Sequence, residues 1–249
     1  SAMAVWNEYA SKHLVYGRNY DGFGFQPLCH DILLVVYHPT DDSLAMATIG
    51  YAGEIYVVNG INEKGIFVEL NNGMPSAGSD FLFDRFAGTT ELMTLLLDAD
   101  NMDYIDAFFR TTKGFASFII GVTDGQEARS YEWCAQDQHR GDGSTPDGLM
   151  VMTNHYVSPE WNYPTPTNET SWDSLTRRQN LLTLAEKHKG NIHAEMLQNI
   201  MGTVITNGGP MSEQTLYQLV FEPATMTLRM RITDVCDWQK IDMGELLCY

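Results

Sequence analysis

Apolar and β-branched runs occur in pairs along the first third of the chain, with turn residues between the members of each pair. The pairs are LVYG with RNYD (residues 14–21), ILLVVYH with LAMATIGY (32–38 and 44–51), and IYVVNG with IFVELNN (55–60 and 66–72). Short runs of this kind predict β-hairpins. We therefore expect three hairpins in series, and the strands of a hairpin run antiparallel.

The rest of the chain alternates between helical and strand patterns. Leu92, Leu95, Leu96 and Ala99 recur at helical spacing, and the segment from Ser174 to Met201 predicts two helices that are broken near Gly190. Further strand signals predict a hairpin over 115–133, a buried strand over 148–154 and a closing hairpin over 216–232. The composition of residues 135–147 predicts a loop.

This order of elements favours an α+β protein. Strands, helices, strands, helices and strands do not follow the strict alternation of a doubly wound parallel sheet. Two antiparallel sheets packed face to face, with helices outside, fit the order. Because 249 residues with 44% hydrophobic content can bury one core, we expect residues 1–249 to form a single domain.

Charge and composition exclude several classes of partner and cofactor. The net charge of −17 repels phosphate backbones and anionic membranes, so we expect no nucleic acid partner. No run reaches the roughly 20 apolar residues of a membrane span, and no signal peptide is evident, which predicts a soluble chain without membrane insertion. The Cys and His residues show no metal-binding spacing, so no metal is expected, and a Cys236–Cys248 disulfide stays open.

Polar residues lie where the predicted strands end. Arg18 and Asp21 occur in GRNYD, Asn71 and Asn72 follow a strand in ELNN, and Asn154 follows one in VMTN. Arg177 and Arg178 begin a predicted helix. Taken singly, each has a structural explanation, because Asp and Asn end strands and cap helices, and helical Arg is usually solvated.

Together, the segments around these residues resemble a known family. The motifs, in chain order, are GRNYDGF (17–23, with Gly22 before the aromatic Phe23), NGINEKGIFVELNN (59–72), VMTNHY (151–156), SLTRRQ (174–179) and the closing hairpin TLYQLVFEPATMTLRMRI (215–232). They resemble the N-terminal-nucleophile (Ntn) amide hydrolases of the choloylglycine hydrolase superfamily. That superfamily includes bile salt hydrolases, penicillin V acylases, acid ceramidase and N-acylethanolamine acid amidase, and the resemblance covers nearly the whole chain.

The resemblance implies a four-layer αββα Ntn-hydrolase sandwich without a cofactor. In these enzymes an N-terminal Cys attacks an amide carbonyl, and its own α-amine is the general base. By analogy, Arg18 and Asp21 orient the nucleophile and its amine. Asn71 and Asn154 stabilise the oxyanion, and Arg177 completes the polar network and favours the thiolate.

This chain has no Cys at its start, and the family's spacing places the nucleophile at Ala2. Three explanations stay open. Ala2 replaces an engineered-out Cys, with Ser1 left by tag cleavage, so the chain as given is inactive; Ser1 is itself the nucleophile; or a Cys that directly precedes Ser1 is absent. A fourth is a natural pseudoenzyme that binds without cleaving.

The expected reaction is hydrolysis of a linear, non-peptide amide that joins a hydrophobic acyl group to a polar amine. Bile acid conjugates, N-acyl amides and penicillin V are the substrate types implied, with acyl transfer as a sister reaction and non-catalytic ligand binding as the alternative. Aromatic stretches at 23–25, 81–86 and 159–163 could line an acyl pocket. The chain is shorter than typical bile salt hydrolases, which weakens the bile-salt assignment and its tetramer and leaves a homo-oligomer open. Its compartment is likewise open, either cytoplasmic or exported after removal of a leader. Asn168 begins a glycosylation sequon.

Overall fold

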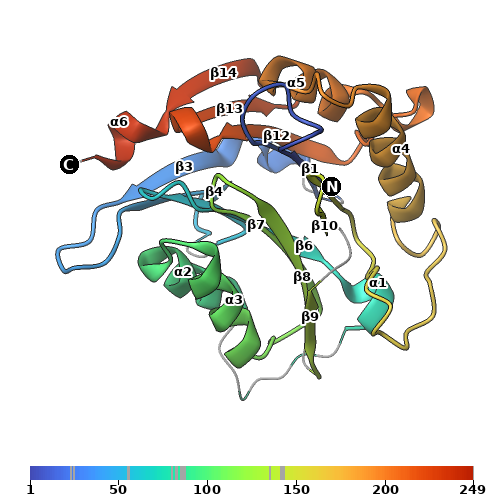
Figure 1. Ribbon diagram of the computed structural model, residues 1–249, viewed down its shortest axis with the longest axis horizontal. Coiled ribbons are helices and arrows are strands. Elements are labelled where there is room, and N and C mark those ends of the chain that lie inside the picture. The colour runs from blue at the N-terminus through green and yellow to red at the C-terminus, as the bar shows by residue number, and fades with distance from the viewer. Residues whose placement is uncertain are drawn as a thin grey trace.

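The computed structural model describes residues 1–22, 24, 26–54, 57–79, 81, 84, 88–134, 136–140 and 144–248. The strands of this part form two seven-stranded sheets that lie face to face, with helices on both outer surfaces (Figure 1). The ladders between the named strands are antiparallel. The predicted α+β sandwich of two antiparallel sheets is therefore confirmed.

The first sheet has the order β10-β11-β1-β2-β12-β13-β14. Its strands are β1 (Ala2–Val5), β2 (Val15–Asp21), β10 (Ser144–Thr145), β11 (Leu149–Met152), β12 (Thr215–Glu222), β13 (Thr227–Ile232) and β14 (Cys236–Asp242). The short β1 lies between β2 and β11, where Ala2 pairs with Arg18 on one side and with Met152 on the other. The start of the chain is therefore held inside a sheet.

The second sheet follows the chain from strand to strand, in the order β3-β4-β5-β6-β7-β8-β9. Its strands are β3 (Ile32–Tyr37), β4 (Met46–Tyr51), β5 (Asn59–Asn62), β6 (Phe67–Asn72), β7 (Phe118–Thr123), β8 (Ala128–Trp133) and β9 (Gln138–Arg140). Three of its pairs, β3 with β4, β5 with β6 and β7 with β8, are hairpins that the sequence predicts.

Two pairs of helices form the outer layers. They are α2 (Gly88–Asp98) and α3 (Met102–Thr111) against the second sheet, and α4 (Ser174–Lys187) and α5 (Ala194–Gly202) against the first. The predicted break near Gly190 separates α4 from α5. Short segments complete the described part: α1 (Met74–Ala77), α6 (Met243–Leu247), and 3₁₀ turns at Gln26–Asp31, Ile205–Asn207 and Pro223–Thr225.

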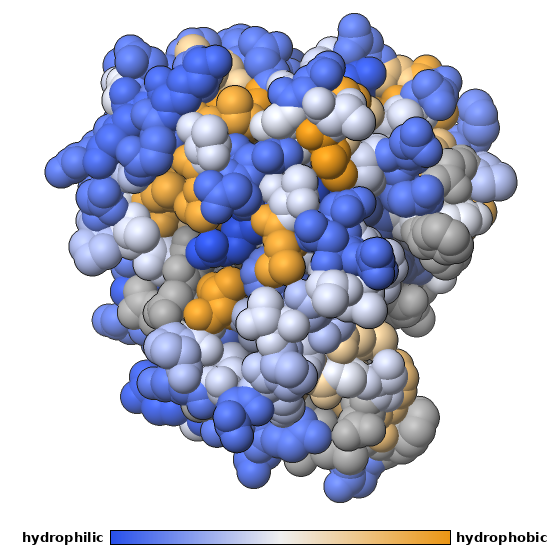
Figure 2. All heavy atoms as spheres, turned by 90° about the vertical axis from the view of Figure 1, so that its right-hand side faces the viewer, coloured by the Kyte–Doolittle hydropathy of each residue, from blue (hydrophilic) through white to orange (hydrophobic). Residues whose placement is uncertain are grey.

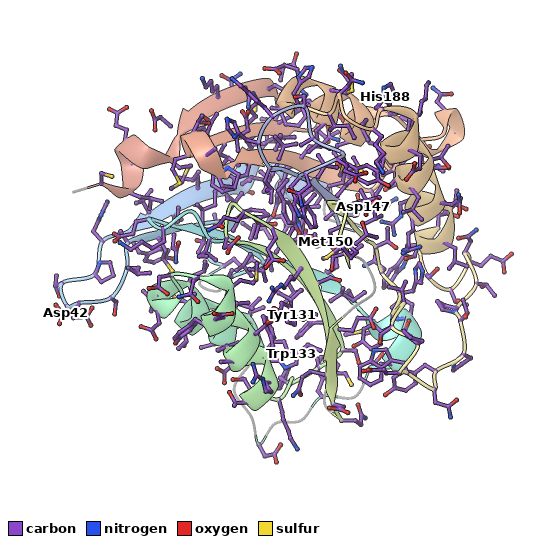
Figure 3. The ribbon with its side chains drawn as sticks, viewed as in Figure 1. Asp42, Tyr131, Trp133, Asp147, Met150 and His188 are labelled. Carbon is purple, nitrogen blue, oxygen red and sulfur yellow. The ribbon has the colours of Figure 1, made fainter. Side chains whose placement is uncertain are left out.

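Strand alternation divides the buried side chains among three layers of core. In β1, Ala2 and Ala4 face the space between the sheets, whereas Met3 and Val5 pack against α4 and α5. In β8, Tyr131 and Trp133 point into the core beneath α2 and α3 (Figure 3). Because alternate residues of a strand face opposite sides, β1 buries side chains on both faces of the first sheet.

Two segment predictions are wrong. Residues 14–21 do not form a hairpin, because Val15–Asp21 is the single strand β2. Gly17 lies within this strand, at the place where α5 packs closely on the sheet. The predicted loop over 135–147 contains β9 and β10. The sequence patterns also missed β1, β14 and α6.

Three further expectations concern membranes, metals and disulfides. In the part of the chain that the structure describes, no helix is long and apolar enough to cross a membrane. The same residues hold no group of three or more His, Cys, Asp or Glu side chains that could bind a metal ion. Cys236 and Cys248 are both free thiols, so the disulfide left open by the sequence is not formed.

Candidate active site

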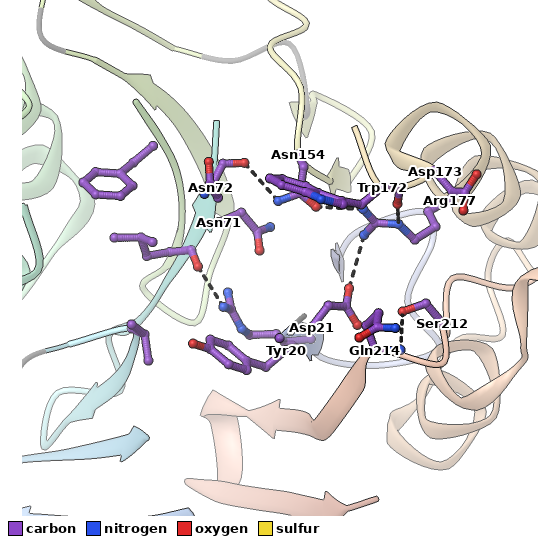
Figure 4. A pocket seen from close by; sticks show the side chains of 15 residues that line it. Tyr20, Asp21, Asn71, Asn72, Asn154, Trp172, Asp173, Arg177, Ser212 and Gln214 are labelled. Carbon is purple, nitrogen blue, oxygen red and sulfur yellow. Dashed lines mark hydrogen bonds and ion pairs between the residues drawn. The ribbon is translucent and has the colours of Figure 1, made fainter. Parts of the chain in front are cut away.

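A pocket of about 530 Å³ opens where the ends of the two sheets meet α4. It is lined by Arg18, Tyr20, Asp21, Gly22, Val58, Leu70, Asn71, Asn72, Phe118, Asn154, Trp172, Asp173, Arg177, Ser212 and Gln214. Hydrophobic and hydrophilic side chains lie close together on the face of the molecule near α1 and α4 (Figure 2). Five of the seven predicted site residues line the pocket, and Figure 4 shows how they approach one another.

Ser1 and Ala2 do not line the pocket but lie directly behind it. The Ser1 amine donates a hydrogen bond to the Asn19 carbonyl oxygen at 2.9 Å and lies 3.7 Å from Asp21 Oδ2. The Ser1 hydroxyl accepts a hydrogen bond from Arg177. Ala2 is fully buried in the core between the sheets, so its side chain is in an apolar environment. The hydroxyl and the amine of Ser1 therefore both lie against the network of Asp21 and Arg177.

Burial changes the protonation of the Ser1 amine. Desolvation, which outweighs the attraction of Asp21, lowers the pKa of this amine from 8.0 to about 4. The nearby Arg177 and Arg18 guanidinium groups lower the pKa further. The amine is therefore neutral near pH 7 and carries a lone pair that can accept a proton.

Arg177 joins the pocket residues through all three of its guanidinium nitrogens. Nη1 donates to Ser1 and lies 3.3 Å from Asp21 Oδ2, Nη2 donates to Asn154 Oδ1 at 2.7 Å, and Nε donates to the Trp172 carbonyl oxygen at 3.0 Å. The planar guanidinium fixes these acceptors in a single plane, which a Lys ammonium could not do. Arg178, its neighbour on α4, does not line the pocket.

Asp21 lies at the end of β2, and its two carboxylate oxygens have different partners. Its Oδ2 faces Arg177 and the Ser1 amine, and its Oδ1 accepts a hydrogen bond of 2.6 Å from the Thr215 hydroxyl. Thr215 begins β12, so the carboxylate is held by the neighbouring strand. No sequence pattern singled out Thr215, because a Thr at the start of a strand is common.

Arg18 crosses the space between the sheets. Its Nη1 forms an ion pair with Glu69 on β6, and its Nη2 donates to the Leu70 carbonyl oxygen at 2.7 Å. Glu69 is fully buried and also accepts a hydrogen bond from the Tyr16 hydroxyl at 3.1 Å. Sequence reasoning missed Glu69, although one signal was present: in FVELNN it shares a strand face with the apolar Phe67, where a solvated carboxylate is not expected.

Asn71 and Asn154 differ in their hydrogen bonds. The Asn154 amide accepts from Arg177 and donates to the Asn72 carbonyl oxygen at 2.9 Å, and its backbone N–H donates to Ser174 Oγ at 2.6 Å. The buried Nδ2 of Asn71, by contrast, has no hydrogen-bond partner among the residues that the structure describes. Buried donors are rarely left unpaired, so this amide is an available donor at the pocket wall.

A tight turn before α4 places Trp172 at the pocket rim. Trp172 and Asp173 both adopt left-handed backbone conformations, with φ of 53° and 58°. Besides the bond from Arg177 to the Trp172 carbonyl, the Asp173 N–H donates to the Asn168 carbonyl oxygen at 2.9 Å. The indole is 50% exposed. No sequence pattern singled out this residue.

The aromatic stretches expected to line an acyl pocket have mixed outcomes. Phe23 and Phe25, and most of the 81–86 stretch, lie outside the described residues. Trp161 and Tyr163 do not line the pocket; both pack near Tyr156, and Trp161 donates to the buried Glu132. The Asn168 amide of the sequon is engaged too, since it bonds the hydroxyl and the backbone N–H of Thr176.

Solved structures of other proteins share this fold. A variant of conjugated bile acid hydrolase from Clostridium perfringens superposes with a TM-score of 0.67 at 10% identity, covering 98% of this chain and 93% of that one. The N-acylethanolamine-hydrolyzing acid amidase ortholog of Caenorhabditis elegans gives 0.62 at 16% identity, over 89% and 92%. Penicillin V acylase from Agrobacterium tumefaciens gives 0.61 at 12% identity, over 98% and 87%. No curated protein matches the sequence.

The fold is thus that of the Ntn-hydrolase superfamily, as the sequence motifs predicted. Residues 6–234 match the family model described as acyl-coenzyme A:6-aminopenicillanic acid acyl-transferase, and the chain belongs to that family.

Proposed function

We propose that this protein is an amide hydrolase that uses an N-terminal nucleophile and an acyl-enzyme intermediate. The observation that carries the proposal is the position of Ser1, whose amine and hydroxyl both contact the Asp21 and Arg177 network behind the pocket. Its substrates are linear, non-peptide amides with a hydrophobic acyl group, such as N-acyl amines, bile acid conjugates and penicillin V.

Each group at the site has its own role in the proposed reaction. The nucleophile attacks the amide carbonyl carbon and gives its proton to the neutral α-amine, and the Asn71 Nδ2 donates to the oxyanion that forms. Collapse of the tetrahedral intermediate breaks the C–N bond, and the protonated α-amine supplies the proton to the departing amine. Water then attacks the acyl-enzyme, releases the acid and regenerates the nucleophile.

Arg18, Asp21, Asn154 and Arg177 act as positioning residues in this proposal. Asp21 holds the α-amine, and Arg177 holds the nucleophile and Asn154 at the same time. Arg18 donates a hydrogen bond to the backbone carbonyl of Leu70 and so fixes the residue before Asn71.

The geometry favours Ser1 over Ala2 as the nucleophile. An Ala2→Cys thiol would point into the apolar core between the sheets, and its nitrogen is part of a peptide bond as long as Ser1 is present. A Cys that directly preceded Ser1 would extend β1 opposite Tyr20, which lines the pocket.

Four chains test the proposal: the chain as given, its Ser1→Ala variant, a chain with one Cys added before Ser1, and a chain that lacks Ser1 and carries Ala2→Cys. Each is incubated with N-acyl amines, glyco- and tauro-conjugated bile salts and penicillin V, and the acyl adduct is located by mass spectrometry. We expect hydrolysis with an adduct on the N-terminal residue of the first or the third chain. Ser1→Ala then abolishes the activity of the first. If no chain cleaves any of these substrates, the hydrolase proposal fails and non-catalytic ligand binding is the function to test next.

A second candidate function is acyl transfer, which the description of the family favours. The acyl-enzyme is the same, but an amine replaces water as the acceptor. Adding hydroxylamine to the active chain distinguishes the two reactions. Acyl hydroxamate formed in large excess over free acid, at an amine concentration far below that of water, would favour the transferase.

A further inference from the structure

The two guanidinium groups of the pocket are already neutralised by the protein. Arg18 and Arg177 are each only 1% exposed. Arg18 pairs with Glu69, and Arg177 faces Asp21 and donates to Ser1, Asn154 and Trp172. An anionic substrate group at either guanidinium would therefore compete with a carboxylate that is already in place.

The described lining residues include no other Lys or Arg. Two carboxylates, Asp21 and Asp173, balance the two guanidinium groups, and Glu69 behind the wall leaves an excess of one negative charge. The neutral Ser1 amine adds no positive charge near pH 7. The chain as a whole carries −17, so the long-range field also repels anions and attracts cations.

Trp172 supplies an aromatic surface at the rim of the same pocket. Its indole is half exposed although Trp side chains are usually well buried, and the left-handed turn that holds it is tied to Arg177 and Asn168. Figure 4 shows the indole extending toward the pocket beside Asn154. The face of an indole ring attracts cations, more strongly than that of Tyr or Phe.

We propose that the pocket selects amides whose amine part carries a positive charge, with the Trp172 indole and the Asp173 carboxylate as the specificity determinants. The preferred substrate class is an N-acylated diamine or polyamine, in which one nitrogen forms the amide and another is a free ammonium group. This inference rests on the proposed function, and it disfavours glycine and taurine conjugates and penicillin V, which are anions.

Three amides with one common fatty acyl chain test the inference. They are the amides of 1,4-diaminobutane, of ethanolamine and of glycine, which are cationic, neutral and anionic near pH 7. We expect kcat/KM to fall in that order, with the cationic amide favoured over the anionic one by about tenfold or more at low salt. The preference should shrink as ionic strength rises from roughly 0.02 M to roughly 0.5 M, because salt screens the attraction.

Three variants locate the determinants. Asp173→Asn removes one charge and keeps the turn, because Asn tolerates the left-handed region. It should lower the ratio of cationic to anionic kcat/KM several-fold. Trp172→Leu should lower kcat/KM for the cationic amide more than for the neutral one. Asp42→Asn makes the same charge change on the distant loop between β3 and β4 (Figure 3) and should leave the ratio unchanged.

Binding of the same three amides to the Ser1→Ala variant, measured by calorimetry, keeps the inference separate from catalysis. If no chain hydrolyses the amides but the affinities follow the expected order, the proposed function fails and the charge selection stands. If the glycine amide binds or reacts as well as the diamine amide, the inference is overturned. It is also overturned if Asp173→Asn and Asp42→Asn change the ratio equally.

Discussion

Asn71 and Asn62 are both buried asparagines of the second sheet, and their amides serve different purposes. The Asn62 amide donates to the Leu96 and Ala99 carbonyl oxygens at 2.9 and 2.7 Å and accepts the backbone N–H groups of Lys64 and Ile66. Within the described part of the chain, the Asn71 Nδ2 has no hydrogen-bond partner. One amide thus stabilises the fold, and the other is free to donate to a substrate.

Exchanging each for Ala should separate the two purposes. Asn71→Ala is expected to lower kcat about 100-fold, as loss of an oxyanion donor does, with little change in the free energy of unfolding. Asn62→Ala should lower that free energy by about 2 kcal/mol or more and leave kcat per folded molecule nearly unchanged. Steady-state kinetics and urea unfolding of both variants check this. Equal losses of stability would contradict the free role of Asn71.

At the residue scale, the sequence predicted some of the polar residues of the site and missed others. Arg18, Asp21, Asn154 and Arg177 line one pocket, because strand ends and the start of α4 converge there. Glu69 and Thr215 lie inside the quoted motifs but escaped notice, since their contacts are long-range: Thr215 bonds Asp21 from a strand near the far end of the chain. Trp172 lies outside the motifs, and its contact with Arg177 is local.

Among the elements, β2 shows why a glycine misleads local prediction. A Cβ at Gly17 would lie 2.9 Å from both Leu197 Cγ and Met201 Cγ on α5. Glycine in a strand often marks such a close approach rather than a turn. The chain therefore continues straight through Gly17, and a local pattern could not reveal α5 above it.

Gly17→Ala should consequently push α5 away from the sheet. We expect a loss of about 1 to 3 kcal/mol in the free energy of unfolding, as in other overpacked cores. Gly202→Ala is the matched control, because a Cβ at that α5 residue meets nothing closer than 4.0 Å. Urea midpoints measure both. A Gly17→Ala midpoint equal to that of Gly202→Ala would show that α5 adjusts without cost.

The junction between β11 and α4 contains a histidine whose charge affects stability. His155 Nδ1 lies 2.7 Å from Ser174 Oγ, which also accepts the Asn154 N–H. Burial, and next the Arg178 and Arg177 charges, lower the pKa of His155 from 6.5 to about 4. The imidazole is therefore neutral in the folded protein where it is already protonated in the unfolded chain.

Because the unfolded chain takes up this proton first, stability should fall as the pH falls from about 6.5 to about 4. At pH 5 the loss due to His155 is expected to be roughly 1 to 2 kcal/mol. His155→Gln removes the titration, so its unfolding free energy should change less between pH 7 and pH 5 than that of the parent chain. Parallel pH dependences of the two proteins would contradict the assignment.

For the molecule as a whole, the order of strands and helices was enough to predict two packed antiparallel sheets. It was not enough to show how the sheets are joined. Besides the shared apolar core, the ion pair between Arg18 on the first sheet and Glu69 on the second links them in the interior. Such a link follows from the packing of the two sheets, which no spacing in the sequence records.

Because the sheets share this core, we propose that residues 1–249 unfold as one domain, in a single transition that tryptophan fluorescence and far-UV circular dichroism report at the same urea concentration.

Glu69→Gln would leave the Arg18 charge buried and unpaired, which costs about 3 to 5 kcal/mol. Both signals should therefore shift together. Glu63→Gln, which removes a solvent-exposed pair with Lys64 in the turn between β5 and β6, should cost less than about 1 kcal/mol. Two separated transitions would divide the chain into two domains, and equal shifts in the two variants would mean that the Arg18–Glu69 pair does not hold the sheets together.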